Sequence, residues 1–418
     1  MLRFRFSNIL FDKIRYLGFP EKQIVSRNMI DSLNANGQSK RTVTHDKLYP
    51  MQTTVKITNI TIPSKVRLRL DQIFEITYLG KPVLGTSVND MQIRNKDTDT
   101  DSPYYGISTD TYYYGTTDAT YPHDYLILYT NLTITAQIDI NRMGVLAVGG
   151  GGGGGKDTGN SSESSGGGGG GAYVFCKLNV KAHDELELTI GEGGRGGGSI
   201  ESDTNSGSDG GTTTVKKYWL SGLYYSNLPS WMIGINPDPV PLYSYTSASG
   251  GKAGNGEASG MGGEDIVSVT ISDDFYNWRY FYGGKGGDEA PGNDSICFAS
   301  DYSNEVPYPE DVKEAINNFF KSNVQNSVAT DYTSYGGGGG GAGSQDESQY
   351  WTNGSGATNG TGGARGIDTD AIAKGPGTPG FNGGGGGAGA DNNHYGGNGG
   401  KGLVIMYVEA QYGDQYYM

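Results

Sequence analysis

The sequence predicts a mainly β protein built around a polyglycine II helix lattice, with a β-rich N-terminal domain and one amphipathic helix in an insert. Three observations lead to this fold class. Glycine makes up 72 of the 418 residues, against roughly 7% in ordinary proteins, and much of it lies in uninterrupted runs. Short apolar segments with a period of two lie between those runs. Residues 1–120, by contrast, contain no glycine run.

Residues 1–120 are expected to form a separate β-rich region. One strand is predicted around Val55–Ile62 and another over Leu68–Tyr78, because both segments are rich in β-branched and alternating apolar residues. The polar, tyrosine-rich stretch from Arg94 to Thr120 is expected to be a loop or linker. Residues 121–418 then form the glycine-rich domain, with β-strands, polyglycine II helices and aromatic inserts.

Uninterrupted glycine runs are the centre of the predicted lattice: Gly149–Gly155, Gly166–Gly171 and Gly336–Gly341. Glycine loses more backbone freedom on folding than any other residue, so such runs are either unfolded or packed main chain against main chain. In GEGGRGG, GGKGGD and GGNGGKG the other residues recur at every third position, which places them on one face of a polyproline II-type helix. We therefore expect these interrupted runs at the edge of the lattice. The glycines assigned to the lattice are Gly152, Gly169, Gly194, Gly338, Gly385 and Gly399.

The alternative for this region is a flexible low-complexity linker, since glycine and serine tracts usually behave as random coil. A linker would lack the apolar segments that separate these runs. Because they alternate or are bounded by turn residues, the segments are predicted to be strands: Tyr125–Val148, Ala172–Val180, Leu186–Ile190, Ile266–Ile271 and Leu403–Val408. Strands and glycine runs therefore alternate in one folded body.

One helix is predicted, over Pro309–Val324. Proline stands at its start, and Glu310 and Asp311 occupy the first turn, where acidic residues are favoured. Apolar residues follow at helical spacing: Val312, Ala315, Ile316, Phe319 and Phe320. This pattern indicates an amphipathic helix that packs against the body of the domain.

Inserts of uneven length separate the glycine runs and contain every tryptophan of the chain: Thr212–Ser249, Glu264–Tyr282, Asp288–Tyr335 and Ser344–Asn353. Long loops on a rigid scaffold commonly carry function, and aromatic residues are enriched at recognition surfaces. The receptor-binding candidates are Tyr218, Trp219, Tyr224, Tyr225, Trp231, Tyr276, Trp278, Tyr280 and Trp351. The alternative is that each aromatic cluster is the small core of its own insert.

Charge and hydropathy argue against two classes of partner. The net charge of -14 opposes binding to phosphate backbones, so no nucleic-acid partner is expected. No segment reaches transmembrane length, and the basic N-terminal segment is broken by charges before an apolar core, so neither membrane insertion nor a signal peptide is expected. The two cysteines, Cys176 and Cys297, lie in apolar contexts and are expected to be buried thiols.

No motif in the sequence predicts catalysis or a cofactor. Gly150–Lys156 matches most of a phosphate-binding loop, but Asp157 stands where a hydroxyl would bind magnesium. The histidines show no metal-ligand spacing: His45, His123, His183 and His394. The chain is therefore expected not to be an enzyme, although distant carboxylates that meet in space could still cleave sugars.

One acidic segment has the spacing of a calcium loop. Asp97, Asp99 and Asp101 match the first three ligand positions, whereas Ser102 and Ser108 replace the turn glycine and the bidentate glutamate. We expect a solvated acidic turn, and the sequence leaves calcium binding at these aspartates open.

The order of strands and glycine runs over Tyr125–Glu409 resembles the glycine-rich domain of bacteriophage tail-fibre and receptor-binding (adhesin) proteins. The resemblance rests on LILYTNLTITAQIDINRMGVLAVGGGGGGG, on GGGGGGAYVFCKLNVKAHDELELTIGEGGRGGG and on the closing GGNGGKGLVIMYVEA. It implies a polyglycine scaffold with variable loops, although the inserts here are large and include a helix. A more distant resemblance to the glycine-rich domain of animal receptor kinases is not accompanied by kinase motifs.

The resemblance implies a virion component, on the tail or surface of the particle and assembled in the host cytoplasm. It would bind a bacterial surface glycan or outer-membrane protein through its aromatic loops and contact other virion proteins through its N-terminal region. Because tail fibres are commonly trimers, a homotrimer is one expected assembly. The alternatives are a structural virion protein such as a baseplate, capsid or fibre-connector subunit, and a polysaccharide depolymerase.

Overall fold

The computed structural model describes residues 41–44, 54–57, 65–78, 81–82, 112–156, 165–198, 205–218, 243–254, 275–287, 292–297, 305–323, 334–339, 362, 368–369, 373–374, 380, 382–388 and 395–414. The chain divides into two compact units. One unit is Leu68–Gln411, and the other combines Met1–Arg67 with Tyr412–Met418.

The smaller unit contains two antiparallel strand pairs. β1 (Arg41–Thr44) pairs with β2 (Thr54–Ile57), so the described part of the strand predicted around Val55–Ile62 is extended. β3 (Lys65–Arg67) pairs with β19 (Tyr412–Asp414), which joins segments from opposite ends of the sequence.

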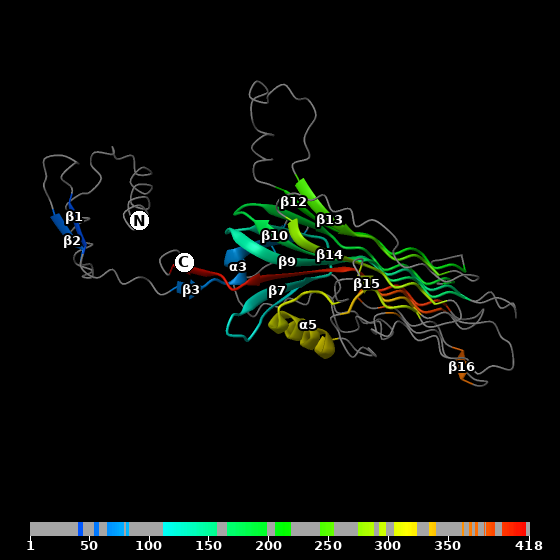
Figure 1. Ribbon diagram of the computed structural model, residues 1–418. Helices are drawn as coiled ribbons and strands as arrows, with labels where there is room; N and C mark the ends of the chain where they lie inside the picture. Colours follow the sequence, from blue (N-terminus) through cyan, green and yellow to red (C-terminus); the bar gives the residue numbers. More distant parts are fainter. Residues whose placement is uncertain are drawn as a thin grey trace, which may run out of the picture. The chain divides into compact units, whose positions relative to one another are not determined.

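Two antiparallel sheets form the β-sandwich of the larger unit (Figure 1). The seven-stranded sheet has the order β15 (Ile296–Cys297), β14 (Phe275–Tyr282), β10 (Tyr173–Val180), β9 (Ile140–Val148), β18 (Leu403–Glu409), β7 (His123–Leu128) and β6 (Tyr112–Thr116). The six-stranded sheet has the order β13 (Tyr243–Ala248), β12 (Thr213–Tyr218), β11 (Glu185–Thr189), β8 (Leu132–Ala136), β4 (Phe74–Tyr78) and β5 (Lys81–Pro82). A separate short pair is formed by β16 (Asp368–Thr369) and β17 (Ala373–Lys374).

The main core lies between these two sheets, and the central strand β9 is buried on both of its faces. Val145 and Ala147 of this strand belong to the core between the sheets, whereas Leu146 and Val148 belong to a second core on the opposite face. Successive side chains of a strand point to opposite faces, so the near-continuous apolar sequence of β9 follows from its central position.

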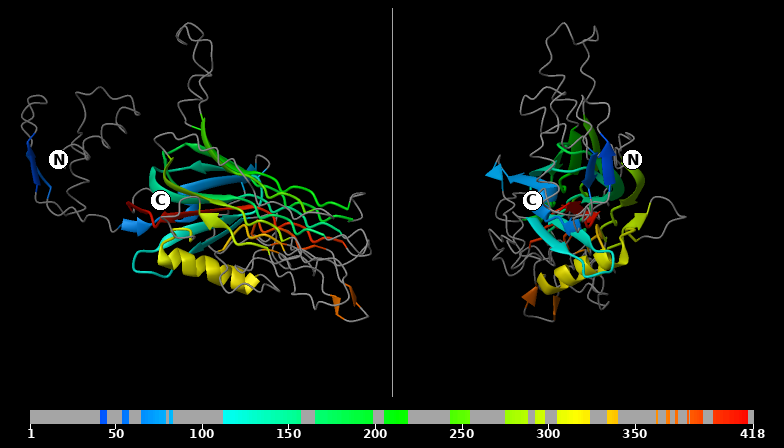
Figure 2. Two further views of the ribbon diagram at one scale, coloured as in Figure 1. Left: turned by 45° about the vertical axis from the view of Figure 1, so that its right-hand side comes forward. Right: turned by 90° about the vertical axis from the view of Figure 1, so that its left-hand side faces the viewer.

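The second core is covered by α5 (Glu310–Asn323), which matches the predicted helix. Val312, Ile316 and Phe320 recur every four residues on one face of α5 and are fully buried against the seven-stranded sheet. Figure 2 shows α5 lying along that sheet. No helix among the described residues is long and apolar enough to cross a membrane.

Residues 68–116 differ from the sequence prediction in two ways. The segment Leu68–Tyr78, predicted as one strand, begins with the short helix α3 (Leu70–Ile73) and continues as β4. The side chain of Gln72 accepts the Arg69 N–H at 2.9 Å, which stabilises a helical turn that strand propensity does not anticipate. In addition, β4, β5 and β6 complete the sheets of the larger unit, although they precede the boundary predicted at residue 120.

Glycine-rich segments continue the strands beyond one end of the sandwich (Figure 1). Gly149 follows β9, Gly191 lies just beyond β11, and Gly283 follows β14. Other segments return and lead into strands: 165–172 into β10, 205–211 into β12 and 395–402 into β18. The two sheets therefore merge into one bundle of main chain.

Main-chain hydrogen bonds join these segments with a period of three residues. Along 149–156, successive N–H groups donate in turn to 166–172, 205–211 and 397–400, and then repeat the cycle. The carbonyl groups of the same run accept from 194–197, 251–254 and Gly386. The run 149–156, here called the central run, is thus surrounded by three segments that accept its hydrogen bonds and three that donate to it. A three-residue repeat is that of a polyproline II-type helix, and the polyglycine II lattice stays our prediction for this bundle.

Main chain packs so closely in this bundle that side chains are excluded. A Cβ atom on Gly152 would overlap the carbonyl of Lys252, and one on Gly338 would overlap the carbonyl of Lys285. Gly152, Gly169, Gly194, Gly338 and Gly385 are buried, whereas Gly399 is partly exposed. In the interrupted runs the non-glycine residues face outward: Glu192, Arg195, Lys285 and Asn398 are exposed and Lys401 is partly exposed. Glycine is therefore required here for close approach rather than for flexibility.

Candidate functional site

The aromatic candidates that the structure describes lie on strands. Tyr218 is the last residue of β12, and Tyr276, Trp278 and Tyr280 lie in β14. The predicted insert Glu264–Tyr282 therefore ends as a strand of the seven-stranded sheet. The remaining candidates lie outside the described residues and stay predictions: Trp219, Tyr224, Tyr225, Trp231 and Trp351, together with the strand predicted over Ile266–Ile271.

A bulge in β14 divides its aromatic residues. Asn277 has a positive φ of 51°, and the pairing of β14 with β10 shifts register between Phe175 and Lys177. An extra residue in one strand turns the following side chains to the other face. Consistent with this change, Tyr276 donates its hydroxyl hydrogen bond to Asn179 Oδ1 at 3.3 Å, whereas Tyr280 packs against the core between the sheets.

Trp278, Tyr280 and Tyr282 form a row, here called the β14 aromatic row. The rings of Trp278 and Tyr280 are stacked, with centroids 5.7 Å apart, and Tyr282 meets Tyr280 edge to face at 5.7 Å. Trp278 is 40% exposed, more than the other two members. Aromatic rings held at a surface present large apolar area with little rotamer freedom to lose. The row can therefore bind an apolar ring or the apolar face of a sugar.

Tyr218 is held by its own sheet. Its hydroxyl donates to Glu187 Oε2 at 2.6 Å, and Lys216 Nζ lies 3.6 Å from Glu187 Oε1. These cross-strand contacts between β12 and β11 occupy the polar end of the tyrosine. The described residues thus place Tyr218 in the six-stranded sheet and apart from the β14 aromatic row.

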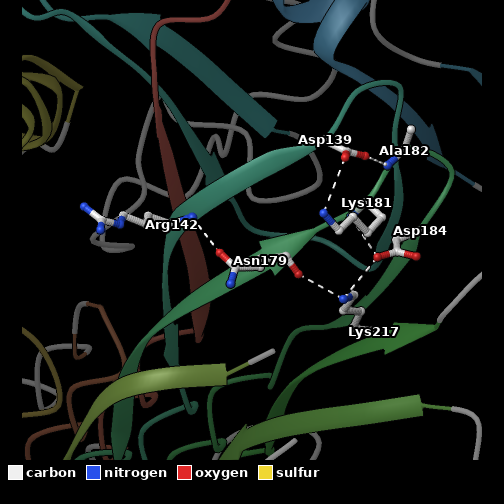
Figure 3. A network of polar contacts seen from close by, with 7 residues as sticks. All are labelled: Asp139, Arg142, Asn179, Lys181, Ala182, Asp184 and Lys217. Atoms are coloured by element: carbon white, nitrogen blue, oxygen red, sulfur yellow. Dashed lines mark hydrogen bonds and ion pairs between the residues drawn. The ribbon is translucent and has the colours of Figure 1, made fainter. Parts of the chain in front are cut away.

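A buried polar network ties the turn between β10 and β11 to β12 (Figure 3). Lys217 Nζ lies 3.0 Å from Asp184 Oδ2 and donates to the Asn179 carbonyl at 2.9 Å, and only 1% of the Lys217 side chain is exposed. Asp184 also accepts the Lys181 N–H at 2.8 Å. These contacts are made within the sandwich, so the network stabilises the fold and is no ligand site. The sequence pattern does not predict this network, because Lys217 lies in a polar segment and its partner Asp184 is distant in sequence.

A second polar cluster fixes the first turn of α5 to the turn between β6 and β7. Asp311 Oδ2 accepts a hydrogen bond from the Thr117 hydroxyl and lies 2.8 Å from His123 Nδ1. Burial alone would raise the pKa of Asp311, but the hydrogen bonds from Thr117 and His123 outweigh it and the pKa is lowered. His123, one of the four histidines considered as metal ligands, therefore pairs with Asp311 and helps to fix α5 in place.

Both cysteines are buried and free, as predicted. Burial raises the pKa of the Cys176 thiol to about 12, so it stays protonated at neutral pH. No group of metal-ligating side chains lies together in the described part of the chain. Asp97, Asp99 and Asp101 lie outside it.

Three polar side chains at the edge of the glycine bundle are not among the residues that the sequence singles out. Ser208, Asp209 and Asn398 accept hydrogen bonds from main-chain N–H groups of neighbouring glycine segments. The available signal was a short polar residue beside paired glycines, which is a weak pattern in a glycine-rich sequence.

Comparison with known proteins adds one finding. The family model described as a glycine-rich domain matches residues 129–409, a range that extends from the end of β7 to the end of β18 and includes the described glycine segments. A search of curated proteins found no match.

Proposed function

The chain belongs to the glycine-rich domain family, and from this premise we propose that it is a receptor-binding adhesin of a bacteriophage tail. In this proposal the glycine bundle is a stiff scaffold, aromatic side chains contact a bacterial surface glycan or outer-membrane protein, and the N-terminal region joins other virion proteins. The observation that carries the proposal is the hydrogen bonding of the central run: each N–H group of 149–156 donates to a surrounding segment, and the carbonyls of 150–154 accept from three others.

A scaffold of this kind suits adhesion for a thermodynamic reason. Binding costs free energy when loops and side chains become ordered, so a rigid support lowers that cost. Residues 149–155 of the central run are buried, and every N–H group of 149–156 is hydrogen-bonded to a neighbouring segment. If several copies are present on one particle, as in a homotrimer, weak single contacts are multiplied through effective concentration.

The β14 aromatic row is the described surface that fits the contact role. Trp278 combines an exposed ring with support from Tyr280 behind it, and tryptophan and tyrosine are enriched among residues that dominate binding energy. The candidates of the Thr212–Ser249 and Ser344–Asn353 inserts are proposed to add further contacts.

The full-length chain, fluorescently labelled at its N-terminus, tests the proposal on bacterial strains that support growth of the particle. We expect saturable binding that Trp278→Ala weakens at least about fivefold, because truncating an aromatic hot spot costs more than about 1 kcal/mol. Tyr121→Ala is the control, since Tyr121 is 84% exposed but lies outside the row. Binding to particle proteins and to no cell would instead assign a connector role, and release of reducing sugar from host polysaccharide would assign a depolymerase.

A further inference from the structure

The outer segments of the glycine bundle differ from the central run in where their N–H groups point. Because a three-residue repeat points successive amides in three directions, an outer segment turns some N–H groups away from the central run. Four outer segments hydrogen-bond to the central run and contain exposed residues: 191–198, 205–211, 249–254 and 395–402. Some of their N–H groups therefore donate to acceptors outside the central run.

Side chains of adjacent outer segments accept hydrogen bonds from N–H groups that do not bond to the central run. The Arg195 N–H donates to Ser208 Oγ at 2.7 Å, and the Gly196 N–H donates to Asn398 Oδ1 at 2.9 Å. The Ala253 N–H donates to Asp209 Oδ1 at 2.9 Å. In each pair the acceptor belongs to a different segment from the donor, so the three side chains bridge neighbouring segments.

Ion pairs join two of the same pairs of segments. Lys252 Nζ lies 2.8 Å from Asp209 Oδ2, and Lys401 Nζ lies 3.0 Å from Glu192 Oε1. Exposed ion pairs such as Lys252–Asp209 add little to stability. The side-chain contacts therefore mainly occupy N–H groups at the edge, and they add little to the stability of the bundle.

We propose that Ser208, Asp209 and Asn398 cap the edge of the glycine bundle and prevent a second copy of this chain from adding its own glycine segments there. Open edges of β-sheets recruit further strands, and proteins block them with polar side chains. An uncapped glycine edge is open in the same sense, because no Cβ atoms keep a second main chain away. The best-fitting partner for such an edge is another surface of bare main chain with the same three-residue repeat, which a second copy provides.

The test compares the full-length parent with the triple variant Ser208→Gly, Asp209→Gly, Asn398→Gly. Sedimentation velocity over a range of concentrations measures association, and hydrogen exchange measures the amides of Arg195, Gly196 and Ala253. We expect about fivefold faster exchange at these amides and larger species that increase with concentration.

Two controls separate capping from other effects. Glu192→Gln changes the net charge by the same amount as Asp209→Gly and breaks one edge ion pair, but it removes no acceptor of a main-chain N–H, so it should sediment like the parent. Asn398→Asp keeps an acceptor and should also behave like the parent. Each single glycine variant is measured as well, in case the triple variant does not fold. Parent-like sedimentation of the folded variants at every concentration, or unchanged exchange at the three amides, would overturn the proposal.

Discussion

Gly153→Ala is the sharpest test of main chain acting as a packed core. Gly153 is buried in the middle of the central run. Its N–H donates to the Ser208 carbonyl at 2.9 Å, and its carbonyl accepts the Gly254 N–H at 2.8 Å. A Cβ atom at this position would overlap the carbonyl of Arg195, so the added methyl group can fit only if neighbouring segments move apart.

The expected cost follows from these contacts. Overpacking a close-packed interior costs about 1–3 kcal/mol, and loss of one or both main-chain hydrogen bonds adds about 1 kcal/mol each. Alanine also lowers the conformational entropy of the unfolded chain, which reduces the loss of stability by up to about 1 kcal/mol. We therefore expect Gly153→Ala to lower the free energy of unfolding by roughly 1–5 kcal/mol.

Urea unfolding followed by circular dichroism and by exchange of the glycine amides measures this loss. Ala253→Ser is the matched control, because Ala253 lies in the same bundle at a partly exposed position that already accommodates a Cβ atom. A Gly153→Ala protein that unfolds at the same urea concentration as the parent would refute close packing of main chain in the central run.

Three further predictions concern the sandwich and its helix. Lys217→Met leaves the Asp184 carboxylate buried without its cation and should lower the free energy of unfolding by about 3–5 kcal/mol, whereas Lys181→Met, which breaks an exposed pair, should cost less than about 1 kcal/mol in the same urea titration. The lowered pKa of Asp311 stabilises the fold above the carboxyl's ordinary pKa, so this contribution should disappear as the pH falls below about 4, and Asp311→Asn should flatten the acid limb of thermal unfolding. Cys176, whose pKa burial raises to about 12, should not react with a maleimide at neutral pH until the protein unfolds, as mass spectrometry would detect.

Local spacing predicted the features that depend on neighbouring residues. The spacing of Glu192 and Arg195 placed both on one outward face, where they are exposed, and the apolar repeat of Val312, Ile316 and Phe320 identified α5 and its buried side. By contrast, the aromatic segment at the end of the Glu264–Tyr282 insert was expected to be a loop. It is β14 because Phe281 stacks on Tyr173 at 4.2 Å and the strand pairs with β10, and this partner is remote in sequence.

The amino-acid sequence by itself determined that glycine main chain is available for close packing, that non-glycine residues lie at the edge of that packing, and that strands and one amphipathic helix accompany it. Only the tertiary structure decided which glycine segments are neighbours, which aromatic rings are supported in the sheets, and which polar side chains cap the edge. The physical reason is that main-chain N–H and C=O groups are the same in every glycine. A bare segment therefore carries no side-chain information about its partner, and the sandwich strands that lead into each segment select its neighbours.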